Sequence, residues 1–271
     1  MFDMVRDCLK IEKSLRQMAG MLLLNGSLTN CPGLIHGKMG IAIFFFHYAQ
    51  HTGNALFDNY AVNLIELIQE QIHANSLADY ERGIAGIGVG LNYLISNNFL
   101  EAEDNIFEDF DERMYRAVMY DPWLDFSLYD GLTGYGRYWI RRLNHSSSNS
   151  KARECLLRIV KHVEVQLSLI PENEQSDVYC FLQDLCQFSE FTELSAKNYK
   201  WDLNCSRLGN SIVGNVARMY YTQPDEIDAV FNQMPDFEKT LSSMGLLTGY
   251  VGEGMLRLST LKSNMLWMHL L

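Results

Sequence analysis

The stretch that decides the fold is Gly33-Leu34-Ile35-His36-Gly37-Lys38-Met39-Gly40, which runs directly into the apolar segment 41–48. Its last four residues form a Gly-x-x-Gly tetrad. Three more such tetrads and one weakened copy, in which Ser211 replaces the first glycine, follow, each ahead of an apolar run. They are Gly83-Ile84-Ala85-Gly86, Gly131-Leu132-Thr133-Gly134, Ser211-Ile212-Val213-Gly214 and Gly249-Tyr250-Val251-Gly252. The tetrads recur about every 40 to 50 residues, with one gap of about two periods, and such spacing indicates a repeat architecture. We therefore expect a sixth, degraded copy near Asp177 to Ser189.

A different pattern lies between the tetrads. Apolar residues recur there at steps of three and four, which is typical of amphipathic helices. The clearest segments are 56–72, 106–118 and 155–167. The runs after the tetrads are apolar nearly all round, as expected of helices buried on every side. Turn residues gather at 144–150, 171–176 and 223–225, where we expect breaks.

The predicted repeat is therefore an outer amphipathic helix followed by an inner apolar helix that begins at the tetrad. Stacked helical hairpins of this kind form either an open solenoid or a closed ring. Glycines at the start of each inner helix favour the ring, because small residues let helix ends approach closely around a narrow centre. We predict an all-α protein, an α/α toroid of about six hairpins, and one domain spanning residues 1–271.

The starts of the inner helices have a second consequence. If all inner helices begin at the same motif, their N-termini point toward one face and expose unsatisfied N–H groups. Such a face could bind an anion or a thiolate. The alternative is that the glycines serve packing alone, and the sequence leaves both interpretations open.

Charge and composition narrow the class of partner. The net charge of −11 argues against nucleic acid or an anionic membrane as the main partner, because both are negatively charged and bind surfaces rich in Lys and Arg. The acids within residues 1–7 do not fit a secretion signal, and the apolar stretch Met21 to Leu24 is too short to span a bilayer. The six cysteines show no CxxC pair or disulfide spacing. We therefore expect a cytoplasmic protein without a membrane span.

The tetrads and their flanks resemble the lanthionine synthetase C-like family. The resemblance is carried by Gly33 to Ala42 with His51-Thr52-Gly53-Asn54 after it, by Arg82 to Gly88, by Ser127 to Gly134 and by Gly245 to Gly252. It implies an α/α toroid that adds cysteine thiols to dehydrated serine or threonine residues of a precursor peptide, forming thioether rings. It also implies a central zinc ion held by two cysteines and a histidine. Zinc suits this chemistry because a cysteine thiol that coordinates zinc loses its proton at neutral pH and becomes the reactive thiolate.

The zinc ligands of the family are largely missing from this chain. Two of them form an adjacent Cys-His pair in a late tetrad, and the matching stretch here places Gly209 and Asn210 at those positions. Glycine has no side chain and asparagine is a poor zinc ligand, so this pair is lost. Cys180 is a distant match to the third ligand. We expect no cofactor; zinc would need another ligand set, which the spacing of Cys180, Cys186 and Cys205 does not support.

Several residues are candidates for a functional site. His36 directly precedes an inner helix and could act as a general acid or base, with helix capping as the alternative. Asp130 precedes the third tetrad; capping is its first interpretation, and catalysis through substrate orientation is the second. Aromatic residues around the same tetrad are candidates for substrate binding or ordinary core residues. They are Tyr129, Tyr135 and Trp139, with Trp123 and Tyr138 in the same cluster.

Three functions remain in consideration. The first is a thioether-forming enzyme related to the lanthionine synthetase C-like cyclases. The second is a non-catalytic scaffold whose partner is a precursor peptide or a peptide-modifying enzyme. The third is a carbohydrate-active α/α toroid that uses Asp125 and Asp130 as its carboxylate pair. Kinship of fold does not carry an activity with it, and the missing Cys-His pair makes peptide binding the preferred hypothesis.

Overall fold

The computed structural model describes residues 2–103, 105–120, 125–194, 199–201, 203, 211–227, 243–262 and 264–271. Within these ranges the chain forms ten α-helices, short 3₁₀ helices and no strand, so the all-α class is confirmed. The α-helices are α1 (Phe2–Asn25), α2 (Lys38–Thr52), α3 (Ala55–Gln71), α4 (Ile84–Ser96), α5 (Glu108–Met119), α6 (Leu132–His145), α7 (Ser150–Gln166), α8 (Glu172–Leu185), α9 (Ile212–Thr222) and α11 (Tyr250–Lys262). The 3₁₀ helices are η1 (Leu167–Leu169), η2 (Ser189–Phe191), η4 (Pro224–Glu226) and η5 (Leu266–Leu270).

The chain divides into two compact units. Unit 1 comprises Met1–Ala74 and Leu208–Leu271, and unit 2 comprises Asn75–Arg207. The first unit therefore combines the beginning and the end of the chain, while the second is continuous. That the whole chain acts as one domain stays a prediction.

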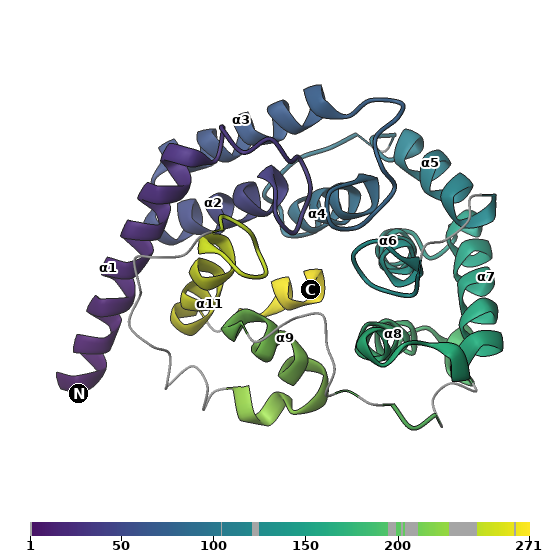
Figure 1. The fold of residues 1–271 in the computed structure, drawn as a ribbon. Coiled ribbons are helices and arrows are strands. Elements are labelled where there is room, and N and C mark those ends of the chain that lie inside the picture. The colour runs from purple at the N-terminus through teal and green to yellow at the C-terminus, as the bar shows by residue number, and fades with distance from the viewer. Residues whose placement is uncertain are drawn as a thin grey trace. The chain divides into compact units, whose positions relative to one another are not determined.

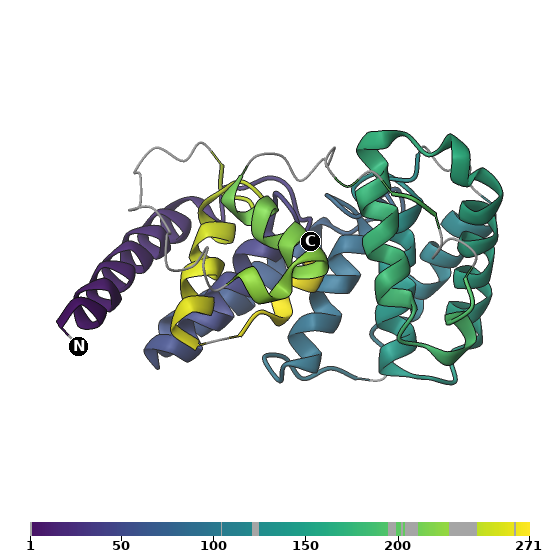
Figure 2. The ribbon, with the colours of Figure 1, turned by 90° about the horizontal axis from the view of Figure 1, so that it is seen from below.

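Unit 2 consists of two layers of helices. α4, α6 and α8 form the first layer, in which α6 packs against both α4 and α8 (Figure 1). α5 and α7 form the second layer; they pack against each other and against α6. The helices of this unit run alongside one another in the rotated view of Figure 2. The layers follow the sequence pattern: α4 is buried along nearly its whole length, whereas α5 buries only the stripe Met114, Ala117 and Val118.

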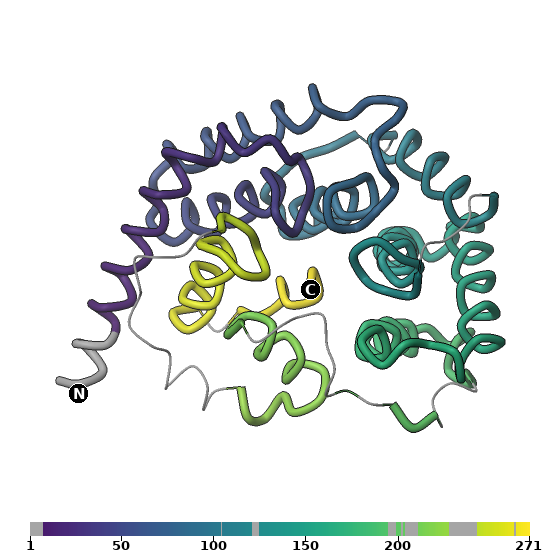
Figure 3. Tube along the Cα trace, in the orientation of Figure 1, coloured from purple at the N-terminus to yellow at the C-terminus, as the bar shows by residue number. Residues whose placement is uncertain are grey.

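Unit 1 is held together by helices from both ends of the chain. α2 packs against α3 and α11, and α1 and α9 also pack against α11. The C-terminal η5 lies beside α9 and α11 (Figure 3). The Trp267 indole donates a hydrogen bond to Ser259 Oγ at 2.8 Å, and the His269 ring lies between the hydroxyls of Tyr220 and Tyr221. The last inner helix is thus a direct neighbour of the first.

Most of the predicted helix pattern is confirmed. The amphipathic segments correspond to α3, α5 and α7, and α2, α4, α6, α9 and α11 all begin within a tetrad. The predicted break at 171–176 is confirmed only at Pro171, because α8 already begins at Glu172. Pro171 is the residue that caps α8, and Glu172 and Glu174 favour its positively polarised first turn. The long helix α1 was not predicted.

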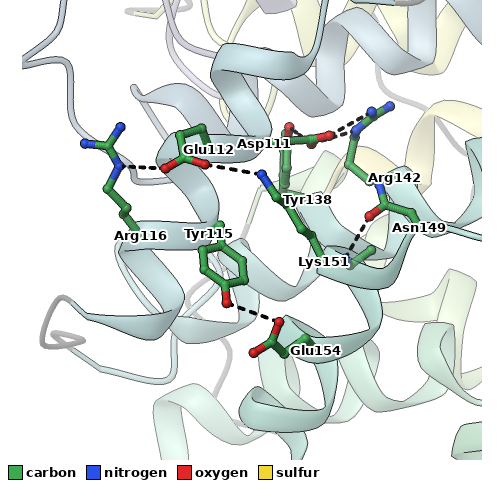
Figure 4. A network of polar contacts seen from close by, with 10 residues as sticks. Asp111, Glu112, Tyr115, Arg116, Tyr138, Arg142, Asn149, Lys151 and Glu154 are labelled. Atoms are coloured by element: carbon green, nitrogen blue, oxygen red, sulfur yellow. Dashed lines mark hydrogen bonds and ion pairs between the residues drawn. The ribbon is translucent and has the colours of Figure 1, made fainter.

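A buried ionic network joins α5 to α6. The Asp111 carboxylate accepts two hydrogen bonds from the Arg142 guanidinium, at 2.8 and 2.9 Å, and a third from the Tyr138 hydroxyl at 2.6 Å (Figure 4). The Arg142 guanidinium also lies 4.3 Å from the centre of the Phe107 ring. The neighbouring Glu112 makes more exposed ion pairs with Lys151 and Arg116. We name the contacts of Asp111, Tyr138 and Arg142 the Asp111 network.

None of the helices in the described ranges combines the length and apolar character needed to cross a membrane.

Candidate functional site

The four tetrads that begin with glycine share one loop geometry. In each, the first N–H group of the inner helix donates a hydrogen bond to the carbonyl oxygen seven residues earlier. The pairs are Lys38 to Cys31 at 2.9 Å, Ile84 to Leu77 at 2.9 Å, Leu132 to Asp125 at 2.9 Å and Tyr250 to Ser243 at 3.1 Å. These four segments, 31–37, 77–83, 125–131 and 243–249, are named the tetrad loops. Each loop folds back over the start of its own helix.

Glycine is required at both ends of the tetrad by close backbone approach. A Cβ atom at Gly37, Gly83 or Gly249 would overlap the carbonyl oxygen six residues earlier. At Gly40, Gly134 and Gly252 the overlapped carbonyl oxygens belong to Leu34, Leu128 and Leu246. The first glycines of α2, α4 and α6 are all extended, so space rather than backbone conformation selects this residue type.

The expectation of unsatisfied N–H groups at the helix starts is wrong for the first amide of each glycine tetrad. In α2, α4 and α11 the second amide is also satisfied, because Met39, Ala85 and Val251 donate to carbonyl oxygens of their own loops at 3.3 Å. The loop thus supplies the acceptors that an anion would otherwise replace. Of the two interpretations of the glycines, packing is the one that this geometry favours.

Neighbouring repeats are joined by a recurring hydrogen bond. Its acceptor is the carbonyl oxygen two residues before the first tetrad glycine, and its donor comes from the preceding repeat. The pairs are Tyr80 N to Tyr129 O at 2.8 Å between α4 and α6, Leu246 N to Ile35 O at 2.7 Å between α11 and α2, and Ser211 Oγ to Leu247 O at 3.1 Å between α9 and α11. The bond between the last and the first repeat therefore has the same form as one between consecutive repeats.

Two degraded copies replace the glycine loop by side chains. At α9, Ser211 stands where the other copies have glycine, and its hydroxyl accepts a hydrogen bond from Gly214 N at 3.0 Å. α8 has no tetrad, but its first turns contain the buried acids Glu174 and Asp177. These accept hydrogen bonds from the amides of Phe126 and Leu128, both at 2.9 Å. The carboxylates thus bond to the α6 loop in place of a loop carbonyl.

One position of each tetrad loop presents a polar side chain to solvent. It is the residue immediately before the first glycine, and we name these four the rim residues: His36, Arg82, Asp130 and Thr248. The residue three before the glycine is buried in every loop, as Leu34, Tyr80, Leu128 or Leu246. Within unit 2, Arg82 Nη2 lies 4.0 Å from Asp130 Oδ1, and their side chains are 56% and 37% exposed. The rim residues are therefore polar side chains that these loops place at one shared, solvent-facing position.

Both predicted catalytic residues are rim residues, in different units. His36 lies against Gly245, where an added Cβ would come within 2.6 Å of its Nδ1. Asp130 does not cap α6, whose N-cap is Gly131 without a side-chain hydrogen bond. The structural carboxylate of this loop is Asp125, which accepts hydrogen bonds from Ser127 N at 2.9 Å and Ser127 Oγ at 2.5 Å. Asp125 is therefore engaged inside the loop, and the structure lends the carbohydrate hypothesis no support.

The predicted aromatic residues have different environments. Trp139 is fully buried against Tyr138, with the ring centres 5.1 Å apart, which favours a core role over substrate binding. Tyr135 is partly exposed. Tyr129 is 9% exposed and lies beside the rim residue Asp130. Trp123 lies outside the described residues.

Cys180 belongs to a polar cluster between α6 and α8 that the sequence did not reveal. Arg137 of α6 pairs with Asp184 of α8 at 3.4 Å, and its side chain is 4% exposed. Cys180 lies one helical turn from Asp184. The residue is partly exposed, but burial of its thiol raises the pKa of that thiol to about 12. The positive charge of Arg137 lowers this pKa, and the negative charges of Asp177 and Asp184 raise it. The spacing Asp177, Cys180, Asp184 on one helix face was the available signal.

This donor set does not fit the zinc ion that the family resemblance implies. The thiol is held protonated, a guanidinium lies beside it, and the neighbouring carboxylates already bind Arg137 and the Leu128 amide. No group of three metal-ligating side chains is present among the described residues. The positions of Gly209, Asn210 and Cys205 lie outside those residues.

The chain matches no protein-family model and no curated protein.

Proposed function

We propose that this chain is a zinc-free protein of the lanthionine synthetase C-like type, and that a basic peptide binds at the rim residues of unit 2, Arg82 and Asp130. The observation that carries the proposal is the rim itself. Four loops of one geometry each place a polar side chain at the same solvent-facing position, while the residue three before the glycine is buried. Two such groups on the neighbouring loops of α4 and α6 suit the regularly spaced polar groups of a peptide.

The toroid is part of this proposal. Its support is the bond from Leu246 N to Ile35 O, by which the last repeat contacts the first in the manner of Tyr80 N and Tyr129 O within unit 2. A repeat protein whose final copy contacts its initial copy through the same bond has the connectivity expected of a ring. In an open solenoid the two terminal repeats would have no such partner.

Charge supports a basic rather than an acidic peptide. The net charge of −11 favours a cationic partner and speeds its association at low ionic strength. The test is a selection of displayed random peptides on the full chain. We expect the selected peptides to be enriched in Lys and Arg, and their affinity to fall as salt is raised. A selection without enrichment of any sequence would contradict the proposal.

The absence of a zinc role leads to a second expected result. Protein purified without chelator, incubated with zinc chloride and desalted should contain far less than one zinc ion per chain. In parallel, Cys180 should react with iodoacetamide at pH 8 at least about a hundredfold more slowly than the exposed Cys8, because only thiolates react. Metal analysis by mass spectrometry and peptide mapping measure the two quantities.

The Cys180→Ser variant is the control for this experiment. Zinc content unchanged from wild type would agree with the proposal. One zinc ion per chain in the wild type, lost in Cys180→Ser, would contradict it and favour a thioether-forming enzyme.

A further inference from the structure

Glu81 departs from the repeat pattern of the tetrad loops. It stands two residues before the first glycine of the α4 loop, and the equivalent residues of the other loops are Ile35, Tyr129 and Leu247. These three residues are buried, at 0%, 9% and 5% exposed, whereas the Glu81 side chain is 21% exposed. An apolar or aromatic side chain thus fills this position in three loops, and the carboxylate of Glu81 is an addition that packing does not require.

Backbone hydrogen bonds between the loops of α4 and α6 fix the place of Glu81. Its amide donates to the carbonyl oxygen of Tyr129 at 3.2 Å, alongside the 2.8 Å bond from the amide of Tyr80. Asp130, the rim residue of the α6 loop, directly follows that acceptor in the chain. Glu81 and Asp130 are therefore neighbours across the junction of two repeats.

One guanidinium nitrogen lies near both of these carboxylates. Arg82 Nη2 is 3.6 Å from Glu81 Oε2 and 4.0 Å from Asp130 Oδ1. A cationic group at this point is attracted by two acids at once. Both distances exceed that of a hydrogen bond, and the Arg82 side chain is 56% exposed. Each ion pair is therefore weak, and a cation from solution can replace the guanidinium.

The junction between α11 and α2 shows that the two acids are not needed to join repeats. It has the same kind of backbone hydrogen bond, from the α11 loop to the α2 loop at 2.7 Å. Leu247 and His36 stand there at the positions of Glu81 and Asp130. The acid pair is thus a feature of the junction between α4 and α6 and not of the repeat.

We infer that Glu81 is a specificity-determining residue of the peptide site. Together with Asp130 it binds one lysine or arginine side chain of the peptide, at the point where the Arg82 guanidinium lies in the free chain. The inference rests on the proposed peptide-binding function. It adds recognition of a cation at one position of the peptide to the general attraction of an acidic chain for a basic partner.

The test uses a lysine-rich peptide from the selection and analogues in which each lysine in turn is replaced by norleucine, a neutral side chain of similar length. Glu81→Gln should bind the unmodified peptide about threefold more weakly than the wild type. One replacement should weaken binding to the wild type and have a smaller effect on Glu81→Gln, because that lysine has lost its acid. Every other replacement should affect both proteins equally.

Glu101→Gln is the matched control, because it removes the same charge from an exposed acid of unit 2. Glu101 follows α4 at the end opposite to the α4 loop, and α4 is about 20 Å long, so salt screens its charge from the site. This variant should bind every analogue as the wild type does. Glu81→Leu introduces the residue type of the α11 loop, and should show the loss of affinity with an unchanged unfolding midpoint.

Equal affinities of the wild type and Glu81→Gln for the unmodified peptide would overturn the inference. A loss in Glu81→Gln that is shared equally among all the lysines would overturn it too, because it would indicate charge attraction without a contact. Both results leave the proposed function intact, since the wild type still binds. A failure of the proposed function appears earlier, as a wild-type protein that binds no selected peptide.

Discussion

Gly252→Ala is expected to destabilise the protein by about 3 kcal/mol, although it replaces glycine by the best helix former inside a helix. The added Cβ would overlap the carbonyl oxygen of Leu246 and come within 2.9 Å of Val213 Cγ2. The Leu246 carbonyl cannot move freely, because the same residue donates its amide to Ile35 O at 2.7 Å. Thermal unfolding followed by circular dichroism measures the effect, expected as a midpoint roughly 10 °C lower.

Gly20→Ala is the matched control in the same unit. Gly20 is an exposed residue of α1, and a Cβ atom added there has nothing within 4 Å. The substitution should therefore stabilise the protein by about 0.5 to 1 kcal/mol, through the lower entropy of the unfolded chain. Effects of the same sign in both variants would contradict the assignment of the tetrad glycines to close backbone contact.

Asp111→Ala is expected to destabilise the protein by about 3 to 5 kcal/mol. Asp111 and Arg142 have side chains that are 14% and 10% exposed, and removing the carboxylate leaves the guanidinium buried without its partner. The Tyr138 hydroxyl loses its acceptor at the same time. Equilibrium unfolding in urea measures the change as a lower midpoint.

Glu112→Ala separates this effect from a general loss of acidic charge on α5. Glu112 pairs with Lys151 and Arg116, but its side chain is 50% exposed, so the unfolding midpoint should remain close to that of wild type. The double variant Asp111→Leu with Arg142→Met should recover much of the lost stability, because it removes both buried charges. A double variant as unstable as Asp111→Ala would indicate that packing, and not the unpaired charge, dominates.

The local sequence determines the loops and inner helices because they obey short-range rules. Both tetrad glycines contact carbonyl oxygens only six residues earlier, and the helix that follows is apolar on all sides. Spacing alone therefore located the helix starts, and it placed His36 and Asp130 at equivalent positions. The hydrogen bonds from the first helix amides to loop carbonyl oxygens could not be predicted in this way, since nothing in the tetrad shows that the loop folds back over its own helix.

The contacts of α8 could not be predicted for a different reason. Glu174 and Asp177 accept amide hydrogen bonds from a loop nearly 50 residues earlier in the chain. In sequence Glu174 looks like an ordinary first-turn acid of a helix, and nothing local marks Asp177 as buried. The ion pair of Arg137 with Asp184 depends on how α6 and α8 pack. Long-range pairing of buried charges leaves little trace in a single sequence.

The most direct test of peptide binding at the rim is the affinity of a selected lysine-rich peptide for two charge variants of unit 2. Arg82 and Asp130 are exposed, so Arg82→Glu and Asp130→Arg should leave the fold intact. The account predicts opposite effects, about fivefold tighter binding to Arg82→Glu and about fivefold weaker binding to Asp130→Arg, both shrinking as salt is raised. Affinities that equal the wild-type value in both variants would contradict it.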